Sequence, residues 1–186
     1  ELESLHPHLA SRALLDFWLN DLSRGYIQIV RDRLSNDDEA VKYVLSEIYL
    51  DLLKLCAPFI PFITEKIWQE LKAKGIVKEE SIHLTEWPSI DKKKIDEKLE
   101  NNLALVMKVI EKGMAERDLV KIGLKWPLLK GHIETNENIN DEMKKIIEKQ
   151  LNVKKIEIKK TDSVEIVVKL NTEMTPELES EGFARE

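Results

Sequence analysis

The chain has 186 residues, of which 42% are hydrophobic and 34% charged, and its formal net charge is −6. This composition predicts a globular, soluble protein and excludes a disordered one, and no apolar run approaches the ~20 residues that a membrane-spanning helix needs. A single cysteine, Cys56, excludes both a disulfide framework and a multi-cysteine zinc site within the chain. We therefore expect a cytoplasmic protein that makes no membrane contact.

Both ends of the sequence suggest a piece of a larger protein. The chain starts without a methionine, and it stops at EGFARE, where a helical pattern is beginning. Its richness in lysine, glutamate and isoleucine is typical of a thermophilic source, although the base composition of the genome can produce the same bias.

Two helices are predicted at the start of the chain. Apolar residues recur at helical spacing from Ser11 to Leu34. The polar cluster SNDD then breaks the pattern, and Asn36 or Asp37 is expected to cap a second helix. The buried face of that second helix should carry Val41, Val44, Leu45, Ile48, Leu52 and Leu55.

A pair of prolines separates the second helix from a third. Pro58 and Pro61 each lack a backbone donor and disfavour helix in the residue before them, so they end the second helix. Pro61 can also open the next helix, which should run to Gly75. The segment SIHLTEWP that follows reads as a short extended return across the helices.

The pattern changes in the second half of the chain. A long helix should begin near Asp91, with Ile95, Leu99, Leu103, Val106 and Ile110 on its apolar face. After it we expect a strand, a helix and two more strands, in the segments GLKWPLLKGHIE, NDEMKKIIEKQL, VKKIEIKK and SVEIVVKL. The predicted class is mainly α: a helical bundle over residues 1–115, followed by a small α+β unit over residues 116–186.

The sequence offers neither a catalytic nor a metal site. Its four histidines are scattered without metal-ligand spacing, and its six glycines are isolated, so no phosphate-binding loop is present. Carboxylates are plentiful, but most lie opposite lysines, as on any solvated helix face.

An arginine-bearing edge on the first helix is the strongest candidate for binding. At 100° per residue, Arg24, Gln28 and Arg31 fall within about 60° of one another, opposite the apolar residues. Two arginines and an amide suit phosphate and base-edge contacts, although an ordinary exposed face would look the same. Arg33 points toward the apolar side and should snorkel or pair with an acid. Gly25 costs a helix roughly 1 kcal/mol relative to alanine, so a close approach of another backbone is expected there.

A second candidate is the basic run RDLVKIGLKWPLLK, residues 117–130. It holds Arg117, Lys121, Lys125 and Lys130 against one aspartate, with Trp126 among them. Cations interleaved with an aromatic ring can bind single-stranded nucleic acid, because bases stack on the ring and phosphates meet the cations. The alternative is that Trp126 belongs to the core and anchors the following strand.

These segments resemble a known family. LNDLSRGYIQIVRDR, CAPFIPFITEKIWQEL and SIHLTEWP are similar to the anticodon-domain segments of class I aminoacyl-tRNA synthetases of the isoleucine, valine and leucine group. RDLVKIGLKWPL, LNVKKIEI and NTEMTPELESEGFARE narrow the resemblance to the isoleucyl-tRNA synthetase family. The resemblance covers essentially the whole chain, as the C-terminal anticodon-binding region and the start of an appended domain.

The resemblance implies a full-length monomeric enzyme that joins isoleucine to tRNA(Ile) with ATP and Mg²⁺. The group's catalytic signatures HIGH and KMSKS are missing, so this part is expected to hold no cofactor and no catalytic residue, and to work with the remaining domains of the same chain. The family often has a tryptophan where Gly25 stands, so stacking at this position is lost. Two alternatives stay open: the equivalent domain of a valine enzyme, and a helical docking scaffold that does not bind RNA.

The resemblance also assigns roles to the candidate residues. Those expected along the anticodon stem and loop or near it are Arg24, Gln28, Arg31, Lys121, Lys125 and Trp126. Those expected to support the helices are Tyr26, Arg33, Pro58 and Pro61. Gly25 would let the RNA backbone or a neighbouring helix come close.

Overall fold

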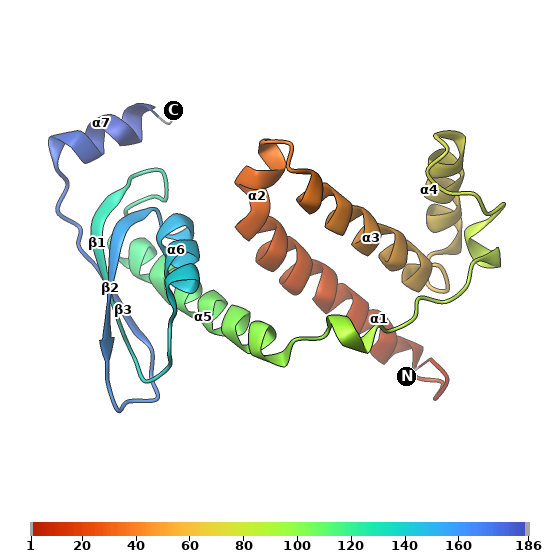
Figure 1. The fold of residues 1–186 in the computed structure, drawn as a ribbon, viewed down its shortest axis with the longest axis horizontal. Coiled ribbons are helices and arrows are strands. Elements are labelled where there is room, and N and C mark those ends of the chain that lie inside the picture. Colours follow the sequence, from red (N-terminus) through yellow and green to blue (C-terminus); the bar gives the residue numbers. More distant parts are fainter. Residues whose placement is uncertain (1, 185–186) are drawn as a thin grey trace. The chain divides into compact units, whose positions relative to one another are not determined.

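The structure is a computed structural model that describes residues 2–184 and divides the chain between Lys92 and Lys93 into two compact units. The first unit is helical, and the second combines helices with a three-stranded sheet (Figure 1). The predicted class, mainly α followed by a small α+β unit, is confirmed. Among the described helices, none combines the length and the apolar character that crossing a membrane requires.

The first unit opens with one continuous helical run from Pro7 to Ser35. It consists of α1 (Pro7–Asp16), a π-helical segment (Phe17–Ile27) and α2 (Gln28–Ser35). The predicted helix is therefore present, but it starts earlier, with a proline in its first turn, where the missing N–H costs nothing. Its eleven-residue π segment has no counterpart in the prediction, because π-helices are rare and occur mostly as single turns.

Helix α3 (Glu39–Cys56) is capped by Asp38, not by Asn36 or Asp37 as predicted. The Asp38 carboxylate accepts hydrogen bonds from the backbone N–H groups of Ala40 and Val41, at 3.0 and 3.3 Å. Asp37 cannot take this role, because its backbone lies in the left-handed region with φ +63°. The predicted buried face is only partly correct: Val41 and Leu52 are buried, whereas Val44 is exposed.

Tyr26, Pro58 and Pro61 each lie at a junction in the first unit. Tyr26 is half-buried against a small core that contains Leu22, Leu52 and Cys56. Burial raises the pKa of the Cys56 thiol. Pro58 lies in the turn that follows α3, and Pro61 occupies the first turn of α4 (Pro61–Ala73), where the chain resumes its helical course.

Side chains of α4 hold the segment that returns across it. The Glu65 carboxylate accepts hydrogen bonds from the Ser81 hydroxyl and the Ile82 N–H, at 2.8 and 3.0 Å. The indole of Trp68, which is only 2% exposed, donates to the Glu79 carbonyl, and the Gln69 amide donates to the Glu80 carbonyl. The predicted extended return is thus present, with a short 3₁₀ turn at Ile82–Leu84.

Acid should loosen this attachment through Glu65. Hydrogen bonds from Gln69, Ser81 and the Ile82 N–H hold the pKa of Glu65 below its ordinary value. The stabilisation is present above the pKa of an unfolded glutamate, about 4.3, and is lost as the pH falls through the lower folded value. Glu65→Gln should therefore flatten the acid limb of a plot of unfolding free energy against pH. Glu70→Gln, an exposed change on the same helix, should leave that limb intact; equal acid limbs in wild type and Glu65→Gln would contradict the prediction.

The second unit contains α5 (Glu97–Leu119), β1 (Leu128–Thr135), α6 (Asp141–Gln150), β2 (Val153–Lys160), β3 (Val167–Leu170) and α7 (Pro176–Ala184). The strand order is β2-β1-β3, so β1 is central. It pairs in parallel with β2 through the α6 crossover and antiparallel with β3.

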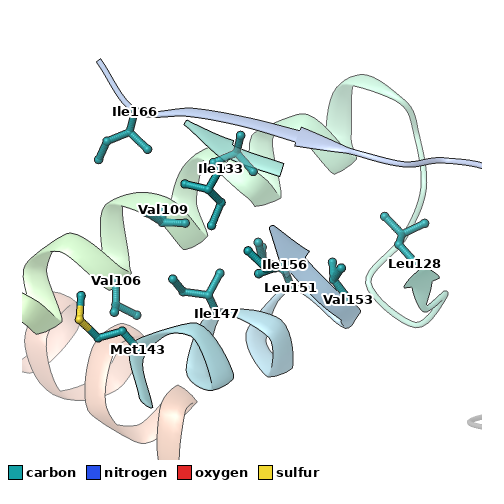
Figure 2. Packing of buried hydrophobic residues seen from close by; sticks show 11 residues of the cluster. Val106, Val109, Leu128, Ile133, Met143, Ile147, Leu151, Val153, Ile156 and Ile166 are labelled. Carbon is teal, nitrogen blue, oxygen red and sulfur yellow. The ribbon is translucent and has the colours of Figure 1, made fainter. Parts of the chain in front are cut away.

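The core of the second unit lies between one face of this sheet and helices α5 and α6. In Figure 2 the side chains of Ile133 and Ile156 from the sheet converge with Val109 of α5 and Ile147 of α6. All four are at most 1% exposed. Because its buried residues belong to this core, α5 forms part of the second unit, and the compact units divide before it rather than at the predicted boundary after residue 115.

Three element boundaries in the second unit also differ from the prediction. Helix α5 begins at Glu97, where the Asp96 carboxylate accepts from the Leu99 N–H, and not near Asp91. The Trp126 N–H closes a turn on the Gly123 carbonyl at 3.1 Å, and β1 starts only at Leu128. Only the last four residues of SVEIVVKL form a strand. The apolar face of α5 is buried from Val106 onward, whereas Ile95, Leu99 and Leu103 are exposed.

Candidate nucleic-acid interface

The three predicted contact residues of the first helical run are all exposed. Arg24 lies in the π segment, and Gln28 and Arg31 lie in α2. Leu22 and Val30 are buried on the opposite side, so the run has a polar edge and an apolar face. The predicted spacing of 100° per residue applies between Gln28 and Arg31. It does not apply through the π segment, where hydrogen bonds join residues five apart.

A row of polar side chains fixes Arg24 on this edge. The Asn20 amide donates to the Asp16 carboxylate at 2.6 Å, and its oxygen accepts from Nη1 of Arg24 at 3.3 Å. The partner of Arg24 is therefore a neutral amide, which orients the guanidinium without neutralising its charge. The sequence did not indicate a role for Asn20, because nothing in the residue pattern distinguishes it from any other exposed asparagine in a helix.

The two arginines of α2, Arg31 and Arg33, differ in their partners. Nε of Arg33 donates to the Asp38 carboxylate at 2.9 Å, one of the two outcomes that its position suggested. This hydrogen bond raises the pKa of Arg33 and lowers that of Asp38. Within residues 2–184 the Arg31 side chain has no hydrogen-bond or ion-pair partner. Arg24 and Arg31 thus carry the uncompensated positive charge of this edge.

Gly25 is explained by crowding inside its own helix. A Cβ at this position would lie 3.2 Å from the carbonyl oxygen of Asn20, five residues earlier. Beyond the adjacent turns of the helix, no other described atom lies within 4 Å of that point. The expected approach of a neighbouring helix is therefore wrong: the π segment brings its own carbonyl against the backbone of residue 25. The approach of an RNA backbone to Gly25 stays a prediction.

The second candidate group lies on the loop between α5 and β1. Lys121 is exposed and adopts a left-handed backbone with φ +57°. Lys125 is also exposed, and its ammonium lies 4.9 Å from the centre of the Trp126 ring. Asn152 fixes this loop by donating from its amide to the carbonyls of Leu124 and Lys125. The two lysines therefore project from a loop whose backbone is held in place.

Arg117 is not a surface cation, although the basic run suggested one. It is 1% exposed, and its five N–H groups donate to the carbonyls of Gly123, Trp126, Leu151 and Asn152 at 2.7–3.2 Å. Two of these carbonyls lie at the C-terminal end of α6, where the helix dipole favours a cation. Burial lowers the pKa of Arg117. Its role is to join α5, the loop and the end of α6.

Trp126 is half-buried and packs inside the second unit. The Phe183 ring meets it edge-on at a centroid distance of 5.2 Å, and Gly182 of α7 lies against its six-membered ring. This packing favours the core role that the sequence left open and leaves less of the ring for a nucleotide base. Gly182 and Phe183 belong to the segment EGFARE, where the sequence indicated that a helix begins. The sequence did not indicate that these two residues pack on Trp126.

Arg24, Gln28 and Arg31 belong to one compact unit, and Lys121, Lys125 and Trp126 to the other. Each group presents cations with exposed ends, and within the described chain no three histidine, cysteine or carboxylate side chains come together as a metal site would require. The exposed cations of the two groups are suited to bind a polyanion through charge and hydrogen bonds.

The family of anticodon-binding domains of tRNA ligases matches residues 1–133, which includes the first helical run, α5 and most of β1. The chain belongs to this family. The match extends past the division between the compact units, in keeping with the presence of candidate residues in both.

The chain is also similar to archaeal proteins named isoleucine–tRNA ligase. It is 34% identical to that of Pyrococcus abyssi over 97% of its own length and 18% of the relative's. The identities to those of Pyrococcus horikoshii and Pyrococcus furiosus are 36% and 37%, in each case over 91% of the chain and 17% of the relative. The chain thus spans less than a fifth of the length of these relatives.

Proposed function

We propose that this chain is the anticodon-binding part of an isoleucine–tRNA ligase and binds the anticodon stem and loop of tRNA(Ile). The observation that carries the proposal is a pair of exposed arginines, Arg24 and Arg31, which no acid among residues 2–184 neutralises, in a domain of the anticodon-binding family. The names of the archaeal relatives support isoleucine as the amino acid.

In this proposal the polar edge of the first helical run touches the RNA. Arg24 and Arg31 supply forked donors that suit phosphates and guanine edges, and Gln28 supplies an amide for a base edge. Lys121 and Lys125 add phosphate contacts from the second unit. Trp126 mainly supports the loop that carries them. Phosphate contacts would dominate the affinity, and base contacts would supply the discrimination between anticodons.

The proposed full-length enzyme is a cytoplasmic monomer that uses ATP and Mg²⁺ to attach isoleucine to the tRNA. Both would act in other domains of the same polypeptide, and the residues described here would only position the tRNA. Affinity for the anticodon then selects which tRNA reaches the distant reaction.

Arg31→Ala should weaken binding of tRNA(Ile) by about 1–3 kcal/mol if the side chain reads a base, and it should flatten the salt dependence by about one unit if it meets a phosphate. Filter binding at several salt concentrations measures both quantities. Arg12→Ala is a matched control, because Arg12 is an exposed arginine of α1 in the same helical run. Unchanged affinity and salt slope for Arg31→Ala would remove Arg31 from the interface.

The same assay separates the alternative functions. The proposal expects stronger retention of tRNA(Ile) than of a tRNA(Ile) with a swapped anticodon. Equal retention of the two would favour a docking scaffold without anticodon recognition. Preference for tRNA(Val) would identify the chain as the corresponding part of a valine enzyme.

A further inference from the structure

The sheet of the second unit has one face that no helix of its core covers. Helices α5 and α6 pack on the face that carries Ile133, Ile156 and Val168. Alternation along the strands places their neighbours on the opposite side. We call this the outer sheet face; its residues are Lys130, His132, Glu134, Lys155, Glu157, Lys159, Val167 and Lys169.

The outer sheet face is positively charged in an acidic protein. It holds four lysines and two glutamates, which leaves two positive charges even with His132 neutral, whereas the whole chain carries −6. Glu157 is shared between Lys130, at 3.6 Å, and the His132 imidazole, at 3.5 Å. Within the described residues Lys155 and Lys169 have no acidic partner.

The strand register places like charges side by side. Lys130 is directly opposite Lys155 on the neighbouring strand, and the residue directly opposite Lys169 is His132, not an acid. Like charges in directly opposed positions destabilise a sheet, and alternation with acids would have removed that cost. Among the described residues, one acid, Glu157, lies in this part of the face beside Lys130, Lys155 and Lys169, so the local net charge is positive.

We propose that the outer sheet face binds the phosphate backbone of RNA without regard to base sequence. Lysine ammonium groups on flexible stems meet phosphates as point charges, and the stems of Lys130 and Lys155 start from neighbouring strands whose backbones lie about 5 Å apart. The face carries no phenylalanine, tyrosine or tryptophan on which a base could stack. Its contact would therefore add affinity and salt dependence but no anticodon discrimination. As a second contact for tRNA, this surface rests on the proposed function.

The test is the binding of the 186-residue chain to a short RNA duplex of arbitrary sequence, which contains no anticodon loop. Lys155→Gln combined with Lys169→Gln should lower the affinity at low salt about tenfold or more. It should also reduce the slope of log K against log salt by about two units, because each phosphate-neutralising cation contributes close to one. The matched control is Lys108→Gln combined with Lys145→Gln, which removes the same charge from exposed positions on α5 and α6.

Thermal denaturation of both double variants tests whether they are folded, so that a loss of RNA binding can be separated from a loss of structure. The outer-face variant should melt at the same temperature as wild type or slightly higher, because it relieves the repulsion between Lys130 and Lys155.

An equal loss of duplex binding in the two double variants, no loss in either, or no duplex binding by the wild-type chain would each overturn the inference. If Arg31→Ala abolishes the preference for tRNA(Ile) while the outer-face variant binds the duplex normally, the proposed function stands and the inference fails. If instead Arg31→Ala keeps the preference for tRNA(Ile) while the outer-face variant loses duplex binding, the inference about the outer sheet face stands and Arg31 is removed from the anticodon interface.

Discussion

Arg117→Met should lower the unfolding free energy of the second unit by about 1–3 kcal/mol for each buried carbonyl that it leaves without a donor. Methionine keeps an apolar stem of similar length but cannot donate. The carbonyls of Gly123, Trp126 and Leu151 would lose the guanidinium that pairs with them, and each is costly to leave unsatisfied when buried. No carboxylate within residues 2–184 pairs with Arg117, so no buried anion is left behind to complicate the measurement.

Urea denaturation followed by circular dichroism measures the Arg117 effect. Arg117→Lys keeps the charge but has three donors on one nitrogen instead of a five-donor fork, so it should recover part of the stability and not all. Arg12→Met removes an exposed arginine from the first unit and should change the unfolding midpoint little. If Arg117→Met unfolds at the wild-type urea concentration, the buried guanidinium does not join α5 to the end of α6.

Gly182→Ala should detach α7 from the body of the second unit, at a cost of about 1–3 kcal/mol, the usual range for overpacking. The new methyl group would lie 2.6 Å from Cζ3 of Trp126 and against Cε3, a ring that cannot bend away. Helix propensity alone would make alanine more favourable than glycine by about 1 kcal/mol, so the sign of the effect separates the two contributions. Near-ultraviolet circular dichroism of the Trp126–Phe183 pair reports the detachment directly.

Glu179→Ala is the matched control for Gly182→Ala, because Glu179 is an exposed residue of the same helix. It should leave the aromatic signal unchanged. A gain in stability for Gly182→Ala, with the aromatic signal retained, would contradict the packing of α7 on Trp126.

Periodicity predicted the helices and strands because each buries one face, and burial imposes its spacing on the sequence. It could not predict the π segment, because the residues of Phe17–Ile27 would also suit an α-helix. Nothing in their types indicates that the hydrogen bonds join residues five apart instead of four. It also predicted an apolar face along all of α5 without indicating that only the part from Val106 onward is covered in the second unit.

The candidate interface was harder to predict because charge type does not reveal burial. Arg117 and Lys121 stand in the same basic run, yet one is enclosed by carbonyls from a segment 34 residues away and the other is exposed. Only the fold brings those carbonyls together. The arginines of the first helical run were easier, because their apolar neighbours Leu22 and Val30 determine which side of the helix meets solvent.

The central place of β1 has a consequence for synthesis on the ribosome. Residues 128–135 emerge before both of their hydrogen-bonding partners, since β2 and β3 follow in the chain. Until Lys160 has left the exit tunnel, the edge of β1 that pairs with β2 stays open to water or to another nascent polypeptide, and the edge that pairs with β3 stays open until Leu170 has emerged. The sheet of the second unit is therefore completed in two stages, and its middle strand keeps one unpaired edge until β3 has emerged.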